Sequence, residues 1–242
     1  DISKEERQGL INQIKENSNV LLHLIDDLID FSKIESGEIN INLENISLNK
    51  LLDEVYNTFA TKYLEQQGKT DITFDLEKQQ SDKFQILADK NRLKQVLYNL
   101  IDNAFKFTES GYINILAYRD KDQVYIAVKD TGLGLNQDEK EIVFDRFRKS
   151  AKGNNKIYGG TGLGLSISKS LASVLEGDLY LEFSEKGKGS VFTLEFPYVL
   201  SEKPGSTNSE DRQSVQGTNY EDNSVESRYP DWSDRKILIV ED

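Results

Sequence analysis

Two asparagines and a lysine share a helical stripe in the segment NRLKQVLYNLIDNAFKFT. Asn99, Asn103 and Lys106 have the spacing i, i+4, i+7, which puts them on one face of an α-helix. An asparagine side-chain oxygen is a hard ligand that suits Mg²⁺, and Mg²⁺ commonly shares its other coordination sites with water and substrate phosphates. A lysine nearby would add a compact positive charge. The stripe indicates a magnesium and phosphate site, although a solvated face of an amphipathic helix has a similar composition.

An acidic residue ends an apolar strand pattern in QVYIAVKD. Alternate residues of this segment share one side of the predicted strand, namely Val124, Ile126, Val128 and Asp130. A carboxylate at the end of a buried row is costly unless a donor meets it, and the amino group of adenine is such a donor. Gly132 and Gly134 follow, where a base or a backbone can approach closely. A strand that ends in an ordinary Asp-Thr-Gly turn remains the alternative.

A third motif, GGTGLGLSISKSLASVLEG, places glycines at the start of a helical pattern. Backbone N–H groups at such a helix start can hold phosphate oxygens. A dinucleotide-binding loop has similar glycines, but it would follow the first strand of a βαβ unit, whereas these glycines follow a long loop. The loop is predicted to form a mobile lid. It carries the aromatic and basic residues Phe144, Arg146, Phe147, Arg148 and Lys149.

Together these segments resemble the ATP-binding catalytic domain of sensor histidine kinases, in the superfamily shared with DNA gyrase and heat-shock chaperone ATPases. Asn99 and Asn103 match the N box of that family, DTGLGL its first glycine box, VFDRFRK its F box and GGTGLGL its second glycine box. Four ordered motifs at compatible spacing are much more specific than any one of them. The resemblance covers nearly the whole chain.

The resemblance implies how the residues would bind Mg²⁺ and ATP. Asn103 would coordinate Mg²⁺ with support from Asn99, Lys106 and Phe107 would flank the nucleotide, and Asp130 would recognise adenine. The residues expected to shape the pocket and the lid are Gly132, Gly134, Gly160, Thr161, Gly162, Leu163 and Gly164.

The resemblance also implies which residues would act in the chemical step: Asn99, Lys106, Arg146 and Lys149. Lys149 occupies a basic F-box position near the γ-phosphate, and Arg146 is a second candidate there. Relatives that hydrolyse ATP carry a Glu where this chain has Asn99, and that Glu can serve as a general base. An amide cannot accept the proton, so we expect slow ATP turnover and transfer of phosphate to an imidazole.

The N-terminal segment, residues 1–37, has a heptad-like pattern. Ser3 and Glu6 fit a capping box, and Gly37 fits a helix stop. Residues at alternating spacings of three and four form the seam, namely Ile11, Ile14, Ser18, Leu21, Ile25, Leu28 and Ser32. The segment resembles the second dimerisation helix of histidine kinases. In that family the phosphate-accepting histidine lies on the preceding helix, in a sequence context that does not occur here.

His23, the single histidine, lies off the heptad seam. A structural or surface role is expected for it, and phosphate acceptance is the less favoured alternative. We therefore expect this chain to bind Mg-ATP without phosphorylating itself, and the histidine-bearing helix to be a partner outside it. A homodimer is expected for the parent protein.

The C-terminal segments differ in composition from the rest. Residues 201–234 are polar, acidic and almost free of aliphatic side chains, which predicts a disordered linker. Residues 235–242, RKILIVED, resemble the first strand of a receiver domain, with Glu241 and Asp242 as part of its acid cluster; an arbitrary apolar tail is the alternative. The ends suggest a part of a hybrid histidine kinase, with residues 38–200 as its ATP-binding domain and a receiver as partner.

Composition limits the remaining classes of function. The net charge of −12 argues against nucleic acid or an anionic membrane as a partner, and the absence of cysteine excludes disulfides and thiolate metal sites. No apolar run reaches membrane-spanning length, so we expect a cytoplasmic domain whose parent could be anchored in the inner membrane by segments outside this chain.

The elements that position these motifs follow from the hydrophobic pattern. Strands are expected at 39–43, 71–76 and 84–88, helices at 48–66 and around Asn99, and hairpins across RDKDQ and SEKGKGS. This order favours an α+β fold, a two-layer sandwich with a mixed sheet and helices on one face, preceded by a long bundle-forming helix. The expected function is a kinase module that transfers the γ-phosphate to a histidine, and an ATP-sensing or scaffold module without transfer is the alternative.

Overall fold

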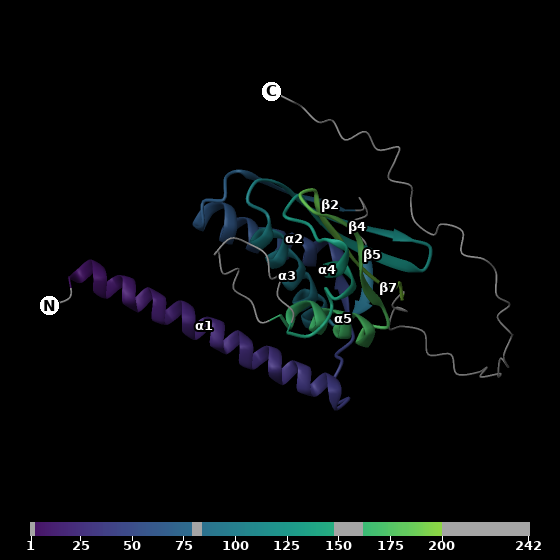
Figure 1. Ribbon diagram of the computed structural model, residues 1–242. Coiled ribbons are helices and arrows are strands. Elements are labelled where there is room, and N and C mark those ends of the chain that lie inside the picture. The colour runs from purple at the N-terminus through teal and green to yellow at the C-terminus, as the bar shows by residue number, and fades with distance from the viewer. Residues whose placement is uncertain (1–2, 79–83, 148–161, 200–242) are drawn as a thin grey trace, which may run out of the picture. The chain divides into compact units, whose positions relative to one another are not determined.

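The computed structural model describes residues 3–78, 84–147 and 162–199. The predicted linker and receiver strand lie outside these ranges, as do Lys149, Gly160 and Thr161 of the predicted lid. Figure 1 shows the arrangement of the helices and strands along the chain.

The first element is the long helix α1, Lys4–Glu35. Its predicted capping box is present, because Glu6 N donates to Ser3 Oγ at 3.1 Å and Ser3 N donates to the Glu6 carboxylate at 2.8 Å. The predicted stop is also confirmed, since Gly37 has a φ of 69° just after the C-cap Ser36. The seam leaves large apolar side chains exposed, including Ile11, Ile14, Leu21, Ile25 and Leu28. An exposed apolar stripe of this length is typical of a helix that pairs in a bundle.

The rest of the described chain forms shorter helices and two β-sheets. The helical elements are α2 (Leu48–Phe59), its π-helical continuation η1 (Ala60–Gln66), α3 (Lys90–Phe107), α4 (Gln137–Glu141) and α5 (Gly164–Val174). The strands are β1 (Glu44–Ser47), β2 (Ile72–Lys78), β3 (Gln85–Ala88), β4 (Gly111–Asp120), β5 (Gln123–Asp130), β6 (Asp178–Glu185) and β7 (Gly189–Pro197).

The main sheet has five strands in the order β2-β4-β5-β7-β6, with β2 and β4 parallel and the other pairs antiparallel. Figure 1 shows α2, α3 and α5 on the same side of this sheet. The strand side chains that face the helices are buried, among them Ile113 and Ile115 of β4 and Val124, Ile126 and Val128 of β5. The expected α+β sandwich, its mixed sheet and both hairpins are therefore confirmed.

Of the expected elements, one strand was misplaced and one helix, with the expected bounds, changes type along its length. Residues 39–43 form no strand; the strand is β1, which pairs with β3 in a separate two-stranded sheet. Asn42 N instead donates to Asp89 at 2.9 Å, so the chain before β1 is held by a side chain. The expected helix 48–66 changes to a π-helix at Ala60. In this wider part the Tyr63 ring stacks on Phe105, with 4.3 Å between ring centroids.

Helix α3 is held at its N-terminus by Asp89. Asp89 Oδ1 accepts from the backbone N–H groups of Asn91 at 3.0 Å and Arg92 at 3.1 Å. Its other oxygen accepts the bond from Asn42, and the residue is 4% exposed. One carboxylate thus satisfies backbone donors of the helix and of the chain before β1.

We expect Asp89→Ala to lower the free energy of unfolding by about 2–3 kcal/mol, because three backbone donors would lose a buried acceptor. Urea unfolding followed by circular dichroism measures this. Ser47→Ala is the matched control, since Ser47 caps α2 through a single contact of 3.5 Å, and it should cost at most about 1 kcal/mol. Equal losses in the two variants would contradict the role given to Asp89.

Candidate functional site

The polar stripe of α3 faces the start of α5. Asn99 Nδ2 donates to Ser168 Oγ at 2.8 Å, and Asn99 Oδ1 accepts from Asn103 Nδ2 at 3.4 Å. A Cβ added at Gly164 would collide with the Asn99 side chain, so glycine here lets Asn99 keep its observed position beside the start of α5. Asn99 therefore uses both polar atoms within the protein. Among the described residues no hydrogen bond reaches Asn103 Oδ1, which leaves this oxygen as the ligand atom that the stripe can offer to a cation.

The start of α5 is fixed by short-range contacts. Leu163 is buried at the N-cap position, and its carbonyl oxygen accepts from Ser166 Oγ at 2.8 Å. Gly162 has a φ of 71°, a backbone conformation that favours glycine. The described part of the second glycine box therefore brings Gly164 to Asn99.

Asp130 ends β5 in a buried position, 7% exposed. Burial raises the pKa of this carboxyl group to about 6, and hydrogen bonds from the backbone N–H groups of Gly132 and Ser190 oppose the rise. The bond from Gly132 is 2.8 Å long. A carboxylate with this pKa is ionised at neutral pH and can accept a hydrogen bond from a ligand in an apolar setting.

The glycines after Asp130 are required by contacts with backbone. A Cβ at Gly132 would collide with the Phe107 carbonyl oxygen, and one at Gly134 with the Glu185 carbonyl oxygen. Between them, Leu133 N donates to Phe107 O at 3.1 Å and Leu133 O accepts from Gly187 N at 2.7 Å. Of the two approaches expected, base or backbone, the structure contains the second. The loop lies between the C-terminal end of α3 and the β6–β7 turn.

Lys106 and Phe107 occupy the last turn of α3. The Lys106 ammonium lies 5.1 Å from the centroid of the Phe107 ring, and Phe107 contacts the DTGLGL loop through its carbonyl oxygen. Cation, ring and loop thus come together at one end of the helix.

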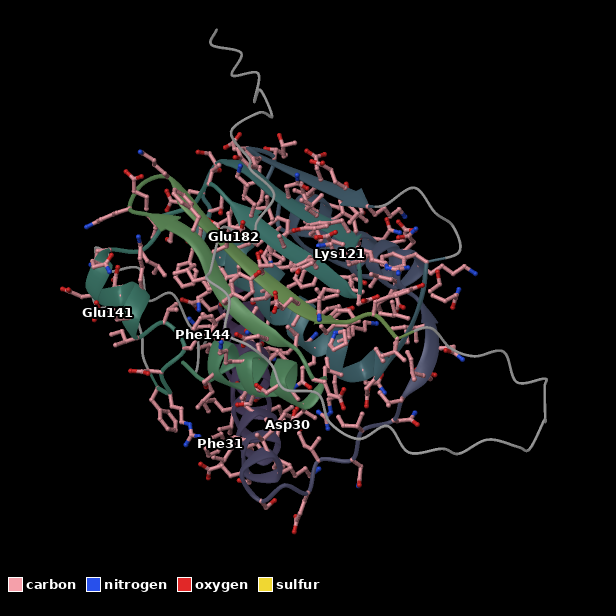
Figure 2. The ribbon with its side chains drawn as sticks, turned by 90° about the vertical axis from the view of Figure 1, so that its right-hand side faces the viewer. Asp30, Phe31, Lys121, Glu141, Phe144 and Glu182 are labelled. Carbon is pink, nitrogen blue, oxygen red and sulfur yellow. The ribbon has the colours of Figure 1, made fainter. Side chains whose placement is uncertain are left out.

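The F box contacts α1 and the sheet. The Phe144 ring packs edge-on against Phe192 of β7, with 6.2 Å between centroids. Arg146 Nη1 donates to Glu35 of α1 at 2.8 Å, and its guanidinium lies 4.3 Å from the Phe31 ring centroid. Phe31 and Phe144 are labelled in Figure 2. The structure therefore brings Arg146 to α1 and not to the polar stripe of α3.

A second polar contact of α1 is made with α3. Asp30, labelled in Figure 2, accepts from Arg92 at 3.1 Å and from Gln95 at 2.7 Å. This ion pair is better shielded from water than the Arg146–Glu35 pair: its side chains are 21% and 19% exposed, against 52% and 53%. Neither contact was predicted, because no local pattern connects α1 with residues so distant in sequence.

Ser168 was also missed, although the sequence carried a signal for it. Ser168 follows Gly164 by one helical turn, so it shares the face of α5 that the glycine turns toward α3. The structure places it, 1% exposed, against Asn99.

Within the described ranges, no three His, Cys, Asp or Glu side chains gather into a group that could hold a metal ion. A cation at Asn103 Oδ1 would share its other coordination sites with water and phosphate oxygens, which is the donor set that suits Mg²⁺. Of the helices in the same ranges, none is both long and apolar enough to cross a bilayer.

Comparisons with known proteins agree with the geometry. Residues 88–200 match the family described as Histidine kinase-, DNA gyrase B-, and HSP90-like ATPase. Circadian input-output histidine kinase CikA of Synechococcus elongatus is 35% identical over 195 residues, which are 80% of this chain and 25% of that protein. The chain spans about a quarter or less of the length of the curated relatives it matches.

Solved structures share the fold. Full-length ShkA in complex with AMPPNP superposes with a TM-score of 0.70 at 28% identity, over 84% of this chain and 41% of that one. Histidine kinase ThkA in complex with the response regulator protein TrrA gives a TM-score of 0.63 at 26% identity, over 81% of this chain and 53% of that one.

The catalytic domain of ThkA alone is 32% identical, with a TM-score of 0.55, and the match covers 65% of this chain and 98% of that domain. Because nearly the whole of that domain is matched, the chain belongs to the histidine kinase family and contains its ATP-binding catalytic domain.

Proposed function

We propose that this chain is the phosphate-donating module of a two-component sensor histidine kinase. It would bind Mg-ATP and transfer the γ-phosphate to a histidine on a dimerisation helix outside residues 1–242, for onward relay to a receiver aspartate. The complex of the related ShkA with AMPPNP, an ATP analogue, supports the choice of nucleotide.

The observation that carries this proposal is the engagement of Asn99. Its amide nitrogen donates to Ser168 and its oxygen accepts from Asn103, and an amide is too weak a base to take a proton from water. A general base at this position would favour hydrolysis. Its replacement by a structurally engaged amide favours a reaction in which the acceptor, an imidazole, is itself the nucleophile.

Different described residues would bind different parts of Mg-ATP. Asn103 Oδ1 would hold Mg²⁺, and Asn99 would orient Asn103 through their hydrogen bond. Asp130 would accept from the adenine amino group, while Lys106 and Phe107 flank the nucleotide. When bound, Mg²⁺ neutralises charge on the phosphates. Lys149 would add a lid cation, and Arg146 could do so only after leaving Glu35.

The remaining assignments concern the parent protein. The exposed apolar seam of α1 supports residues 1–37 as a dimerisation helix in a homodimer. We propose residues 38–200 as the catalytic domain, 201–234 as a linker and 235–242 as the first strand of a receiver. Use of ATP as phosphate donor would place this part of the protein in the cytoplasm.

A transfer assay tests the proposal. The chain is incubated with labelled Mg-ATP and a full-length parent kinase whose own catalytic domain is disabled but whose acceptor histidine is intact. We expect acid-labile phosphate on the parent, little ATP hydrolysis by the chain alone, and no label on His23. Binding of Mg-ATP without any transfer would support the ATP-sensing or scaffold alternative instead, and rapid hydrolysis that Asn99→Ala abolishes would contradict the role of Asn99.

Asn103→Ala should remove a direct ligand of Mg²⁺ and weaken Mg-ATP binding by at least about tenfold, with a smaller effect on ATP in the presence of EDTA. Isothermal titration calorimetry measures both affinities. Asn99→Ala should show the same selectivity at a smaller size, because it acts through Asn103. Asn91→Ala, an exposed change on the first turn of the same helix, is the control and should bind as the unchanged chain does. If Asn103→Ala weakened ATP binding equally with and without Mg²⁺, Asn103 would not be a metal ligand.

The pKa of Asp130 predicts opposite pH effects on stability and binding. Folding raises the pKa of its carboxyl group from 3.8 to about 6. Between these two pH values the folded protein therefore keeps a proton that the unfolded chain has lost. Stability from this group is therefore greatest at low pH and falls as pH rises. Relative to Asp130→Asn, the unchanged protein should lose about 1 kcal/mol of unfolding free energy from pH 5 to pH 7.

Adenine recognition needs the ionised form, so the affinity of the unchanged protein for Mg-ATP should rise about tenfold over the same interval. Asp130→Asn should bind weakly at both pH values, measured by calorimetry. Asp75→Asn, an exposed change on β2, should keep the pH profile of the unchanged protein. If Asp130→Asn kept the same pH dependence of Mg-ATP affinity, the titrating group would be another one, such as the phosphates of ATP.

A further inference from the structure

Lys69 lies in a tight turn after η1. Gly68 has a φ of 65°, and Lys69 N donates to the Tyr63 carbonyl oxygen at 3.0 Å. Thr70 N donates to Gly68 O at 2.9 Å. These bonds fix the backbone on both sides of Lys69, so its side chain starts from a defined position beneath the C-terminal end of α3.

The Lys69 ammonium contacts the carbonyl end of α3. It donates to Phe105 O and lies 3.4 Å from Thr108 O, where Thr108 is the C-cap of the helix. It also lies 5.6 Å from the centroid of the Tyr63 ring. The last carbonyl groups of a helix have no partners within it and form the negative end of its dipole. A cation here satisfies acceptors and is attracted by the dipole.

The same short segment carries groups of the proposed nucleotide site. Lys106 and Phe107 lie between the two residues whose carbonyls Lys69 contacts. The Phe107 carbonyl accepts from Leu133, and it blocks any side chain at Gly132. A shift of this turn would therefore move the cation, the ring and the loop after Asp130 together.

We infer that Lys69 is a positioning residue for nucleotide binding: its ammonium holds the last turn of α3 so that Lys106, Phe107 and the loop after Asp130 keep the geometry that ATP requires. The inference rests on the proposed roles of those residues. Lys69 itself does not touch the nucleotide.

The surroundings of Lys69 act on its pKa in opposite directions. Burial lowers its pKa from the ordinary 10.5, while the charges of Glu109 and Asp102 oppose the change. Asp102 also accepts from Lys62 at 2.7 Å and from Tyr63 at 2.8 Å. Lys69 therefore loses its charge at a lower pH than an exposed lysine. Its attraction to the helix end is present below its pKa and is lost as pH rises through it, whereas arginine keeps its charge throughout.

Lys62 provides a matched control. It lies on η1, just before the turn that holds Lys69, and over the same Tyr63 ring, at 4.6 Å, but it binds the side chain of Asp102 and not the end of α3. Mg-ATP affinity of the whole chain is measured by calorimetry at pH 7.5 and pH 10.5 for Lys69→Met, Lys69→Arg and Lys62→Met, with urea unfolding of each.

At pH 7.5 we expect Lys69→Met to bind roughly five- to tenfold more weakly and Lys69→Arg to bind within about twofold of the unchanged chain. Lys62→Met should also stay within about twofold. Between pH 7.5 and pH 10.5, the ordinary pKa of lysine, the unchanged chain should lose affinity relative to Lys69→Arg, because Lys69 is more than half neutral at the higher pH while arginine keeps its charge. This rescue and this pH difference would not arise from a loss of packing alone.

Equal affinities in Lys69→Met and Lys62→Met, or pH profiles that coincide in the unchanged chain and Lys69→Arg, would overturn the inference. If Lys69→Met does not fold, the pH comparison with Lys69→Arg still decides. Asn103→Ala and Asp130→Asn separate the two levels of failure. Should these variants weaken binding while Lys69→Met does not, only the role of Lys69 is wrong; should none weaken it, the proposed site is wrong as well.

Discussion

A buried helix must find partners for the backbone groups at both of its ends, and α3 meets this requirement with charged side chains. Asp89 accepts from the free N–H groups at one end, and Lys69 donates to the free carbonyls at the other. Each charge has the sign that the helix dipole favours at its end. Because α3 also contributes Leu93, Val96 and Leu97 to the core, its axial position fixes where Asn99, Asn103 and Phe107 lie.

Close approach of backbone to backbone is the second constraint. Gly132 and Gly134 allow the loop after β5 to lie against Phe107 and Glu185, and Gly164 allows α5 to start against Asn99. These glycines shape the site by removing volume, so that three segments distant in sequence share a small space. A methyl group at Gly132 or Gly134 would collide with backbone, and one at Gly164 would push the Asn99 side chain from its place.

Much of this arrangement could be predicted where local periodicity coincides with burial. The rows Val124, Ile126, Val128 on β5 and Leu93, Val96, Leu97 on α3 are buried as their spacing indicates. The strand expected at 39–43 failed because its neighbours, not its composition, decide pairing: β3 pairs with 44–47. The partner of Arg146 is 111 residues away, and Lys69 belongs to no motif, so neither contact could be read from spacing. Asn99 and Asn103 were placed on one face correctly, whereas their link to Ser168 needed the packing of α5 on α3.

The half-exposed ion pair between Arg146 and Glu35 determines in part how readily α1 separates from the F box. An ion pair with this exposure is worth about 0–1 kcal/mol and weakens further with salt, so exchanging Glu35 for another anion costs Arg146 little. If a phosphate recruits Arg146, thermodynamic reciprocity requires that nucleotide and α1 compete for it, each weakening the other by the same factor. Because the pair contributes at most about 1 kcal/mol, this competition changes either affinity by no more than a few-fold. The better-shielded contact of Asp30 with Arg92 would still join α1 to α3.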